Sequence, residues 1–364
     1  MHLTRWYGGG LVGLLAGTAS LGAPANRPAD VAELAEEVRN KGWIVYGAIG
    51  PRAEMDLYLM RPDGSDRRRI TNTRDMHEGA ARFSPDGRKL MYRRISKGTR
   101  VHHNRWGFQG HVVIANADGS NPVAIGKDGE HPWACWGPDG KQISCLTFRG
   151  IQIIDLATNK VVRQLPRKGI YQQLFWSPDG EWFCGVTNLY GEMWTVARMN
   201  AKTGEINPLC KLQDTPPEEP SEGSGILRGA ECTPDWFPDS KHVLFSRRPR
   251  APVGYPWTQL WMASGDGKQM RLVHGEDGRH LYGGTFSPDG KYLLYSRVLL
   301  DGAGGLVSGT YMGLTRFRDV PTYGGKGRRL RDAFPNAKRE PVLNLPAGYE
   351  PDWTYADVTK QGPS

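Results

Sequence analysis

Imidazole and carboxylate side chains recur in this 364-residue chain at one offset, seven or eight residues before the proline of a repeated motif. They are His77/Glu78, Glu130/His131, Tyr171, Glu231 and His280, the tyrosine being the exception. Imidazole and carboxylate together suit a transition metal, or general acid–base work on a bound sugar. One hypothesis is therefore a divalent metal held by His77, His131, Glu231 and His280. The other is that these histidines only hydrogen-bond the loop backbone, and the sequence leaves the cofactor open.

Arginines form a second set of candidate residues, because they are expected to stand just after the second strand of their blades. We expect them to ring the same face as the histidines and to bind an acidic glycan or a protein partner. The predicted ligand-binding residues are Arg93, Arg94, Arg247, Arg248 and Arg297, with Trp106 and Trp257 from two long loops. Arg149 stands at the same kind of position. The alternative is that these arginines are a solvated edge.

The repeated motif itself is an aromatic residue, one further residue, proline, aspartate and usually glycine. Phe83-Ser84-Pro85-Asp86-Gly87 is the first copy, and the other prolines are Pro138, Pro178, Pro238 and Pro288. Proline presets φ for the first central turn position, and glycine takes the left-handed conformation that closes a tight β-hairpin. The flanking runs alternate apolar and polar residues, as half-buried strands do. A sixth, degenerate copy is predicted at Tyr349-Glu350-Pro351-Asp352.

The spacing of the copies predicts the architecture. Units of roughly 40 to 60 residues, each with two hairpins, are typical of a β-propeller. Six copies predict an all-β, six-bladed β-propeller of four-stranded antiparallel blades. The blade that begins at Trp43 lacks its first strand, and we expect the segment 349–357 near the C-terminus to supply it, because closure removes free sheet edges.

The chain ends predict export. Residues 1–25 have the charged start, short apolar core and small-residue cleavage site of a signal peptide. Residues 26–41 contain one amphipathic helix, 42–357 the propeller and 358–364 a tail. No other run is long and apolar enough to span a membrane. The net charge of +9 would suit a polyanion, but a periplasmic or secreted location argues against nucleic acid.

The aromatic-Ser-Pro-Asp-Gly hairpin, together with Leu57–Ser65 and Arg69-Ile70-Thr71-Asn72-Thr73, resembles the repeat of TolB-type six-bladed propellers over residues 42–357. The resemblance implies a WD40-like protein-binding or scaffold module, as a subunit of a periplasmic or envelope complex. TolB also carries an α/β domain before its propeller, and only residues 26–41 stand there in this sequence. A Tol–Pal role is therefore not expected.

The same repeat is similar to that of oligogalacturonate lyases and of prolyl oligopeptidases. The alternative function is thus a glycan-active enzyme, such as a lyase that uses the His/Glu cluster at the channel mouth. A peptidase is disfavoured because no Gly-x-Ser-x-Gly nucleophile elbow occurs. The sequence favours a binding module over an enzyme, and no catalytic residue is assigned.

Overall fold

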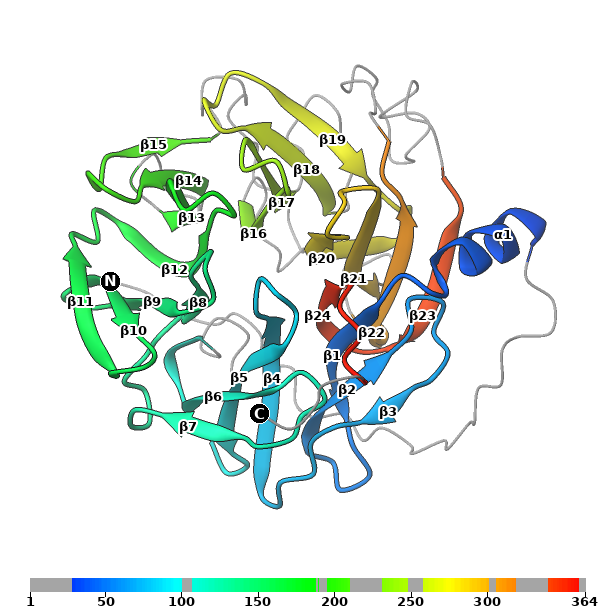
Figure 1. The fold of residues 1–364 in the computed structure, drawn as a ribbon. Helices are drawn as coiled ribbons and strands as arrows, with labels where there is room; N and C mark the ends of the chain where they lie inside the picture. The colour runs from blue at the N-terminus through cyan, green and yellow to red at the C-terminus, as the bar shows by residue number, and fades with distance from the viewer. Residues whose placement is uncertain are drawn as a thin grey trace.

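Six four-stranded sheets stand around a central axis as the blades of a propeller (Figure 1). This computed structural model describes residues 28–99, 107–187, 189, 195–209, 231–247, 258–300, 306–318 and 340–359. The predicted all-β, six-bladed fold with four antiparallel strands per blade is confirmed. The predicted signal peptide lies outside the described residues.

The blades follow one another along the chain, and in each blade the strand named first below is innermost in the ring. Blade 1 contains β24 (Tyr349–Thr354), β1 (Trp43–Ile49), β2 (Met55–Met60) and β3 (Arg68–Arg69), and blade 2 contains β4 (Met76–Phe83), β5 (Lys89–Ser96), β6 (His111–Asn116) and β7 (Val123–Ile125). Blade 3 contains β8 (Cys135–Trp136), β9 (Gln142–Thr147), β10 (Gly150–Asp155) and β11 (Lys160–Leu165), and blade 4 contains β12 (Ile170–Trp176), β13 (Trp182–Thr187), β14 (Thr195–Asn200) and β15 (Ile206–Pro208). Blade 5 contains β16 (Glu231–Trp236), β17 (His242–Arg247), β18 (Gln259–Ser264) and β19 (Met270–His274), and blade 6 contains β20 (Arg279–Phe286), β21 (Tyr292–Leu300), β22 (Leu306–Arg316) and β23 (Val342–Ala347).

Blade 1 joins the two ends of the propeller. β24 pairs antiparallel with β1, with Trp43 opposite Thr354 and Ile44 opposite Trp353. The expected closure by the C-terminal strand is therefore confirmed. It leaves the inner edge of β1 paired, and this prevents the exposed edge that an incomplete blade would present.

The register of the last motif copy was wrong. The core aromatic of a blade faces the second strand at one fixed place, as Phe83 faces Leu90. In blade 1 the residue in that place is Trp353, opposite Ile44, and not Tyr349, which lies opposite Gly47. Trp353 is buried, and its indole N–H donates to the carbonyl of Lys41 at 2.7 Å. The predicted copy, aligned on Tyr349, is therefore four residues away from the true one, aligned on Trp353. No hairpin follows β24, so Pro351 is not the turn proline of the motif.

A bulge recurs in the inner strands, three residues before the core aromatic. The residue there has a positive φ in all six blades, namely Ala80 (53°), Trp133 (48°), Gln173 (54°), Thr233 (49°), Gly283 (55°) and Glu350 (46°). Pairing with the second strand shifts register at this point in blades 1, 2, 4, 5 and 6. Such bulges redirect side chains, and positive φ in non-glycine residues stores strain that the surroundings must hold.

Helix α1 (Ala29–Val38) packs outside the ring against β23 (Figure 1). Glu37 accepts a hydrogen bond from Tyr292 of blade 6, and Arg39 pairs with Asp63 of blade 1 at 3.0 Å. The helix thus bridges the first and last blades, and its buried Leu34 and Val38 join the core between them. In the part of the chain that the structure describes, no helix is long and apolar enough to cross a membrane.

Candidate functional site

Two of the predicted metal ligands, His77 and His280, bind the backbone of the preceding blade. The Nδ1 atom of His77 accepts a hydrogen bond from the Met55 amide at 3.0 Å. His280 Nδ1 accepts one from the Thr258 amide at 2.8 Å. Both amides stand at the start of a third strand, so the two histidines do equivalent work in blades 2 and 6. The alternative prediction, that these histidines hydrogen-bond loop backbone, is confirmed for this pair.

The other two predicted ligands stand at a different strand position. His131 and Glu231 are seven residues before their prolines, whereas His77 and His280 are eight. His131 also precedes β8, which begins at Cys135, so it does not stand in an inner strand as His77 and His280 do. His131 is buried, and burial lowers its pKa. Among the described side chains, which exclude that of Glu231, no three His, Cys, Asp or Glu residues could hold a metal together. The four-residue metal centre stays a prediction.

The predicted arginine surface is placed partly inside the protein. Arg93, Arg247 and Arg297 are each at least nine-tenths buried, with exposed fractions of 5%, 2% and 6%. Arg93 donates to the carbonyl of His131, and burial lowers the pKa of Arg93 to about 10. Arg297 pairs with Glu276 at 3.0 Å. Arg149, which was expected on the same surface, is exposed. The predicted binding residues Arg248, Trp106 and Trp257 lie outside the described residues.

Arg94 and His77 lie beside a cluster of buried carboxylates between blades 1 and 2, which we call the blade 1–2 cluster. Its acids are Glu54, Asp56 and Glu78, each no more than 2% exposed. Its bases are Arg52, Arg69, Arg94 and Lys97. The acids come from the start of β2 and from β4. Arg69 and Arg94 stand on β3 and β5, and Arg52 and Lys97 lie in turns.

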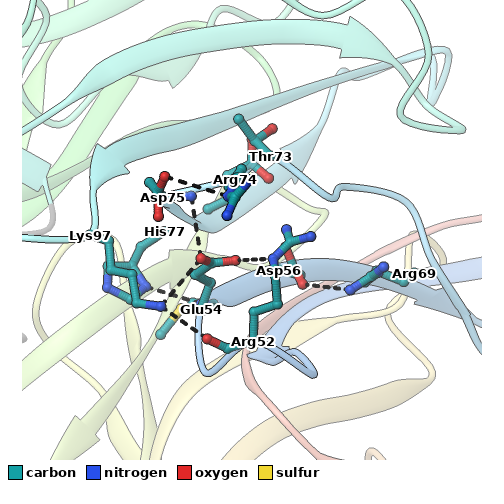
Figure 2. Close-up of polar contacts among 11 residues, drawn as sticks. Arg52, Glu54, Asp56, Arg69, Thr73, Arg74, Asp75, His77 and Lys97 are labelled. Carbon is teal, nitrogen blue, oxygen red and sulfur yellow. Dashed lines mark hydrogen bonds and ion pairs between the residues drawn. The ribbon is translucent and has the colours of Figure 1, made fainter.

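Figure 2 shows Glu54 at the centre of several contacts of this cluster. Its Oε2 atom accepts from Arg52 Nε at 2.8 Å, and its Oε1 atom accepts from Lys97 Nζ at 3.3 Å. The hydrogen bond from Arg52 is the main cause that lowers the pKa of Glu54 to about 2. Glu54 is therefore a fixed negative charge that ties the end of β5 to the preceding blade.

In Asp56 and Glu78 only one of the two carboxylate oxygens has a hydrogen-bond partner. Asp56 pairs with Arg69 at 3.3 Å and Glu78 with Arg94 at 2.7 Å, but Asp56 Oδ1 and Glu78 Oε2 have no hydrogen-bond partner. Burial raises the pKa of Asp56, and the negative charge of Glu78 adds to this effect. Every buried acid of the cluster thus has a cation beside it, and among these ion pairs only Glu54 with Lys97 joins blade 1 to blade 2.

A second set of side chains, not predicted from the sequence, meets in the central channel. It consists of the residue immediately before the core aromatic in each blade, and we call it the channel ring. Its members are Asp352, Arg82, Cys135, Phe175, Asp235 and Thr285 from blades 1 to 6 in turn. Arg82, Asp235 and Asp352 are half-buried. The inner-strand bulge lies two residues earlier and helps to set the direction of these side chains.

The contacts of Arg82 show that the channel ring spans the axis. The Arg82 guanidinium carbon lies 5.7 Å from the centre of the Phe175 ring of blade 4. An Arg82 Nη1–H donates to the carbonyl of Glu350 in blade 1 at 3.3 Å. Asp235 belongs to blade 5, which stands opposite the blade of Arg82 in a ring of six. Burial raises the pKa of Asp235, and the positive charge of Arg82 partly opposes this rise.

The positive charge of Arg82 does not fully compensate the burial of the two carboxylates in the channel ring. Burial raises the pKa of Asp352 to about 6, although Arg82 opposes the rise. Its Oδ2 atom accepts from the Phe83 amide at 2.7 Å, which fixes the carboxyl between blades 1 and 2. Asp235, Asp352 and nearby Glu350 all act on the one guanidinium of Arg82. The ring is thus acidic in a chain whose net charge is +9, and it can accept hydrogen bonds from a cation or exchange a proton near pH 6.

The sequence did contain a signal for the channel ring. Aligning the five hairpin copies on their prolines places Arg82, Cys135, Phe175, Asp235 and Thr285 in one column. Asp352 joins this column only when the last copy is aligned on Trp353. This column was not predicted as a site, because the recurring histidines and glutamates at the start of the inner strands were predicted as the site instead.

Comparison with solved structures gives a likeness in fold. TolB from Acinetobacter baumannii has 16% sequence identity and a TM-score of 0.57, and the match covers 86% of this chain and 67% of that one. A putative TolB from Agrobacterium tumefaciens has 17% identity and a TM-score of 0.51, covering 85% and 90%. An oligogalacturonate lyase from Vibrio parahaemolyticus has 13% identity, coverage of 76% and 71%, and a TM-score of only 0.43, which is too low to support an argument.

No protein-family model matches the sequence, and no curated protein matches it. The identities to the solved structures are low enough that they bear on the fold alone. The chain is a six-bladed β-propeller similar in fold to TolB.

Proposed function

We propose that this chain is an exported protein-binding propeller, a scaffold subunit of a periplasmic or envelope complex, and that a cationic side chain of its partner enters the channel ring. The likeness in fold to TolB supports a binding module of this kind. The acidic channel ring supports the cationic group, and it is the observation that carries the proposal.

The electrostatic argument rests on Asp352 and Asp235. Both carboxyls have raised pKa values because burial removes water that would stabilise their charged forms. An ammonium or guanidinium group placed beside them supplies the missing positive charge and favours ionisation. Charged hydrogen bonds of this kind are stronger than neutral ones, particularly in a site shielded from water.

The alternative of an acidic glycan finds less support in this geometry. Three of the predicted arginines are buried, and Arg94 is already paired with Glu78. A uronate in the channel would meet the carboxylates of Asp235 and Asp352. The glycan-active enzyme stays a prediction, which would be supported by binding of oligogalacturonate that weakens with salt.

The proposal is tested with a short acetylated peptide amide containing one central lysine, titrated calorimetrically at pH 7.5. We expect binding to the wild-type chain and a loss of affinity of about tenfold or more in Asp235→Asn and Asp352→Asn, since each removes a charged acceptor. Glu181→Gln, at an exposed ion pair with Lys202, is the matched control and should change nothing. The same variants are compared in the capture of partners from the source cells. Equal affinity in all variants, or no binding to wild type, would overturn the channel proposal.

A further inference from the structure

The outermost strand of blade 3, β11, is an uncovered sheet edge. Outer strands β3, β7 and β15 are only two or three residues long, β19 has five residues of which none is exposed, and β23, which is six long, lies against α1. β11 also has six residues, and five of them, Lys160 to Gln164, are exposed. An exposed edge strand presents unpaired backbone donors and acceptors that another strand can use.

Two adjacent valines stand on this edge. Val161 and Val162 are 49% and 53% exposed. Pairing with β10 shifts between Ile153, which faces Arg163, and Ile154, which faces Val161, so Val162 has no partner residue. A bulge of this kind redirects side chains, which is consistent with both valines being accessible from the edge. The result is a small apolar patch on a strand that nothing in the described structure covers.

Basic residues surround the valines. Residues 160–168 contain four of them, Lys160, Arg163, Arg167 and Lys168, and no acid. The hairpin tip of Phe148 and Arg149 continues the surface, since Gln164 Nε2 donates to the carbonyl of Arg149 at 3.1 Å. Phe148 is 91% exposed. The edge therefore combines unpaired backbone, apolar side chains and positive charge.

We propose that an extended, acidic segment of a partner protein docks along β11 as a fifth strand of blade 3. Its backbone pairs with the edge, its acidic side chains face Lys160 and Arg163, and its apolar side chains contact the valines. Strand addition of this type takes affinity from main-chain hydrogen bonds and specificity from side-chain contacts. A second copy of this chain is a poor occupant, because Lys160 and Arg163 of two β11 strands would face like charges.

This inference rests on the proposed function, in that the partner is a protein, but it concerns a different surface from the channel ring. The probe is an acetylated peptide amide of alternating valine and glutamate, eight residues long. Two comparison peptides replace glutamate by lysine, or carry N-methyl groups on alternate amides. Binding is measured by fluorescence anisotropy, and protection of β11 by amide hydrogen exchange.

We expect the glutamate peptide to bind wild type and to protect β11, with at least about tenfold weaker binding for both comparison peptides. Arg163→Glu and Val162→Asp should each weaken binding by a similar factor. The matched control is Val123→Asp on the short outer strand β7, where Val123 is 63% exposed. It should leave binding unchanged.

Asp235→Asn and Asp352→Asn should also leave binding of this peptide unchanged, which separates failure of the edge proposal from failure of the channel proposal. Equal binding of the lysine peptide, or equal loss in Val123→Asp, would overturn strand docking at β11. So would a wild-type chain that does not bind the peptide, or one that dimerises through β11 and becomes monomeric in Val162→Asp.

Discussion

Replacing Asp352 by asparagine should change how stability depends on pH. Asparagine retains an oxygen that accepts from the Phe83 amide, so the substitution removes the titration and keeps the hydrogen bond. Burial raises the pKa of Asp352 from 3.8 to about 6 in the folded chain. The folded state therefore holds this proton more tightly than the unfolded state does.

A carboxyl of this kind destabilises the fold once it must ionise. Below about pH 4 it is protonated in both states, and between about pH 4 and pH 6 the wild type loses stability as pH rises, because unfolding releases a proton. The rise in pKa from 3.8 to about 6 corresponds to about 3 kcal/mol, at 1.36 kcal/mol for a tenfold change in the equilibrium constant. Above about pH 6.5 the loss is complete and constant. In Asp352→Asn this loss is absent.

The assay is unfolding of both proteins at fixed ionic strength from pH 4 to pH 8, by urea and by heat. The free energy of unfolding of the wild type should fall, relative to that of the variant, by roughly 2 to 3 kcal/mol across that range. For a chain of this size, with about 0.7 kcal/mol/K of unfolding entropy, that is a relative change in Tm of roughly 3 to 4 °C. Asp139→Asn, at an exposed turn, controls for the loss of one negative charge. Parallel curves for wild type and Asp352→Asn would refute the account of the channel ring.

Three further predictions concern the fold. A chain truncated before Tyr349 should be insoluble or melt far below the parent, because β1 loses its inner partner; cooperative melting at the parental temperature would contradict this. Gly87→Val should cost roughly 2 to 4 kcal/mol in urea unfolding, since Gly87 has a φ of +70° and a side chain would overlap its neighbours, whereas Gly98→Val, with open space around it, should cost less than about 1 kcal/mol. Glu78→Gln should cost roughly 2 to 4 kcal/mol by leaving a cation beside a neutral amide, against less than about 1 kcal/mol for the exposed Glu181→Gln. Equal losses for the two glycines would show that backbone strain and overlap are not the cause, and equal losses for the two glutamates would show that burial is not.

Local chemistry explains why the fold was predictable. Proline, aspartate and glycine restrict a turn regardless of what surrounds it, so Pro85-Asp86-Gly87 predicts a hairpin from three residues. Five such hairpins at regular spacing then predict blades, and the unpaired start at Trp43 predicts closure. The last strand was misaligned because it ends the propeller without a hairpin, and the motif has no proline to mark Trp353.

The site was less predictable because it depends on side-chain direction. An inner-strand bulge with positive φ at Thr233 or Gln173 has no sequence signature, yet it sets which residues face the channel. The burial of these arginines was also not visible in the sequence: Arg247 is the last residue of a second strand and Arg297 lies within one, whereas exposed Arg149 follows one. The expectation that the arginines follow a second strand was wrong for Arg93, Arg94 and Arg297, which lie within one, and Arg247 is the last residue of one. The neighbouring blade then decides whether such a guanidinium meets solvent or the interior.

Closure through β24 also affects how the chain must fold during synthesis. The pair of Trp43 and Thr354 joins residues 311 positions apart, since 354 − 43 = 311. Contacts so distant in sequence cost loop entropy before they contribute any stability, and they slow folding. A nascent chain in which β24 has not yet been made has β1 without its inner partner, so its ring stays open. Anything that recognises the closed ring therefore reports that β24 has been made and has paired with β1.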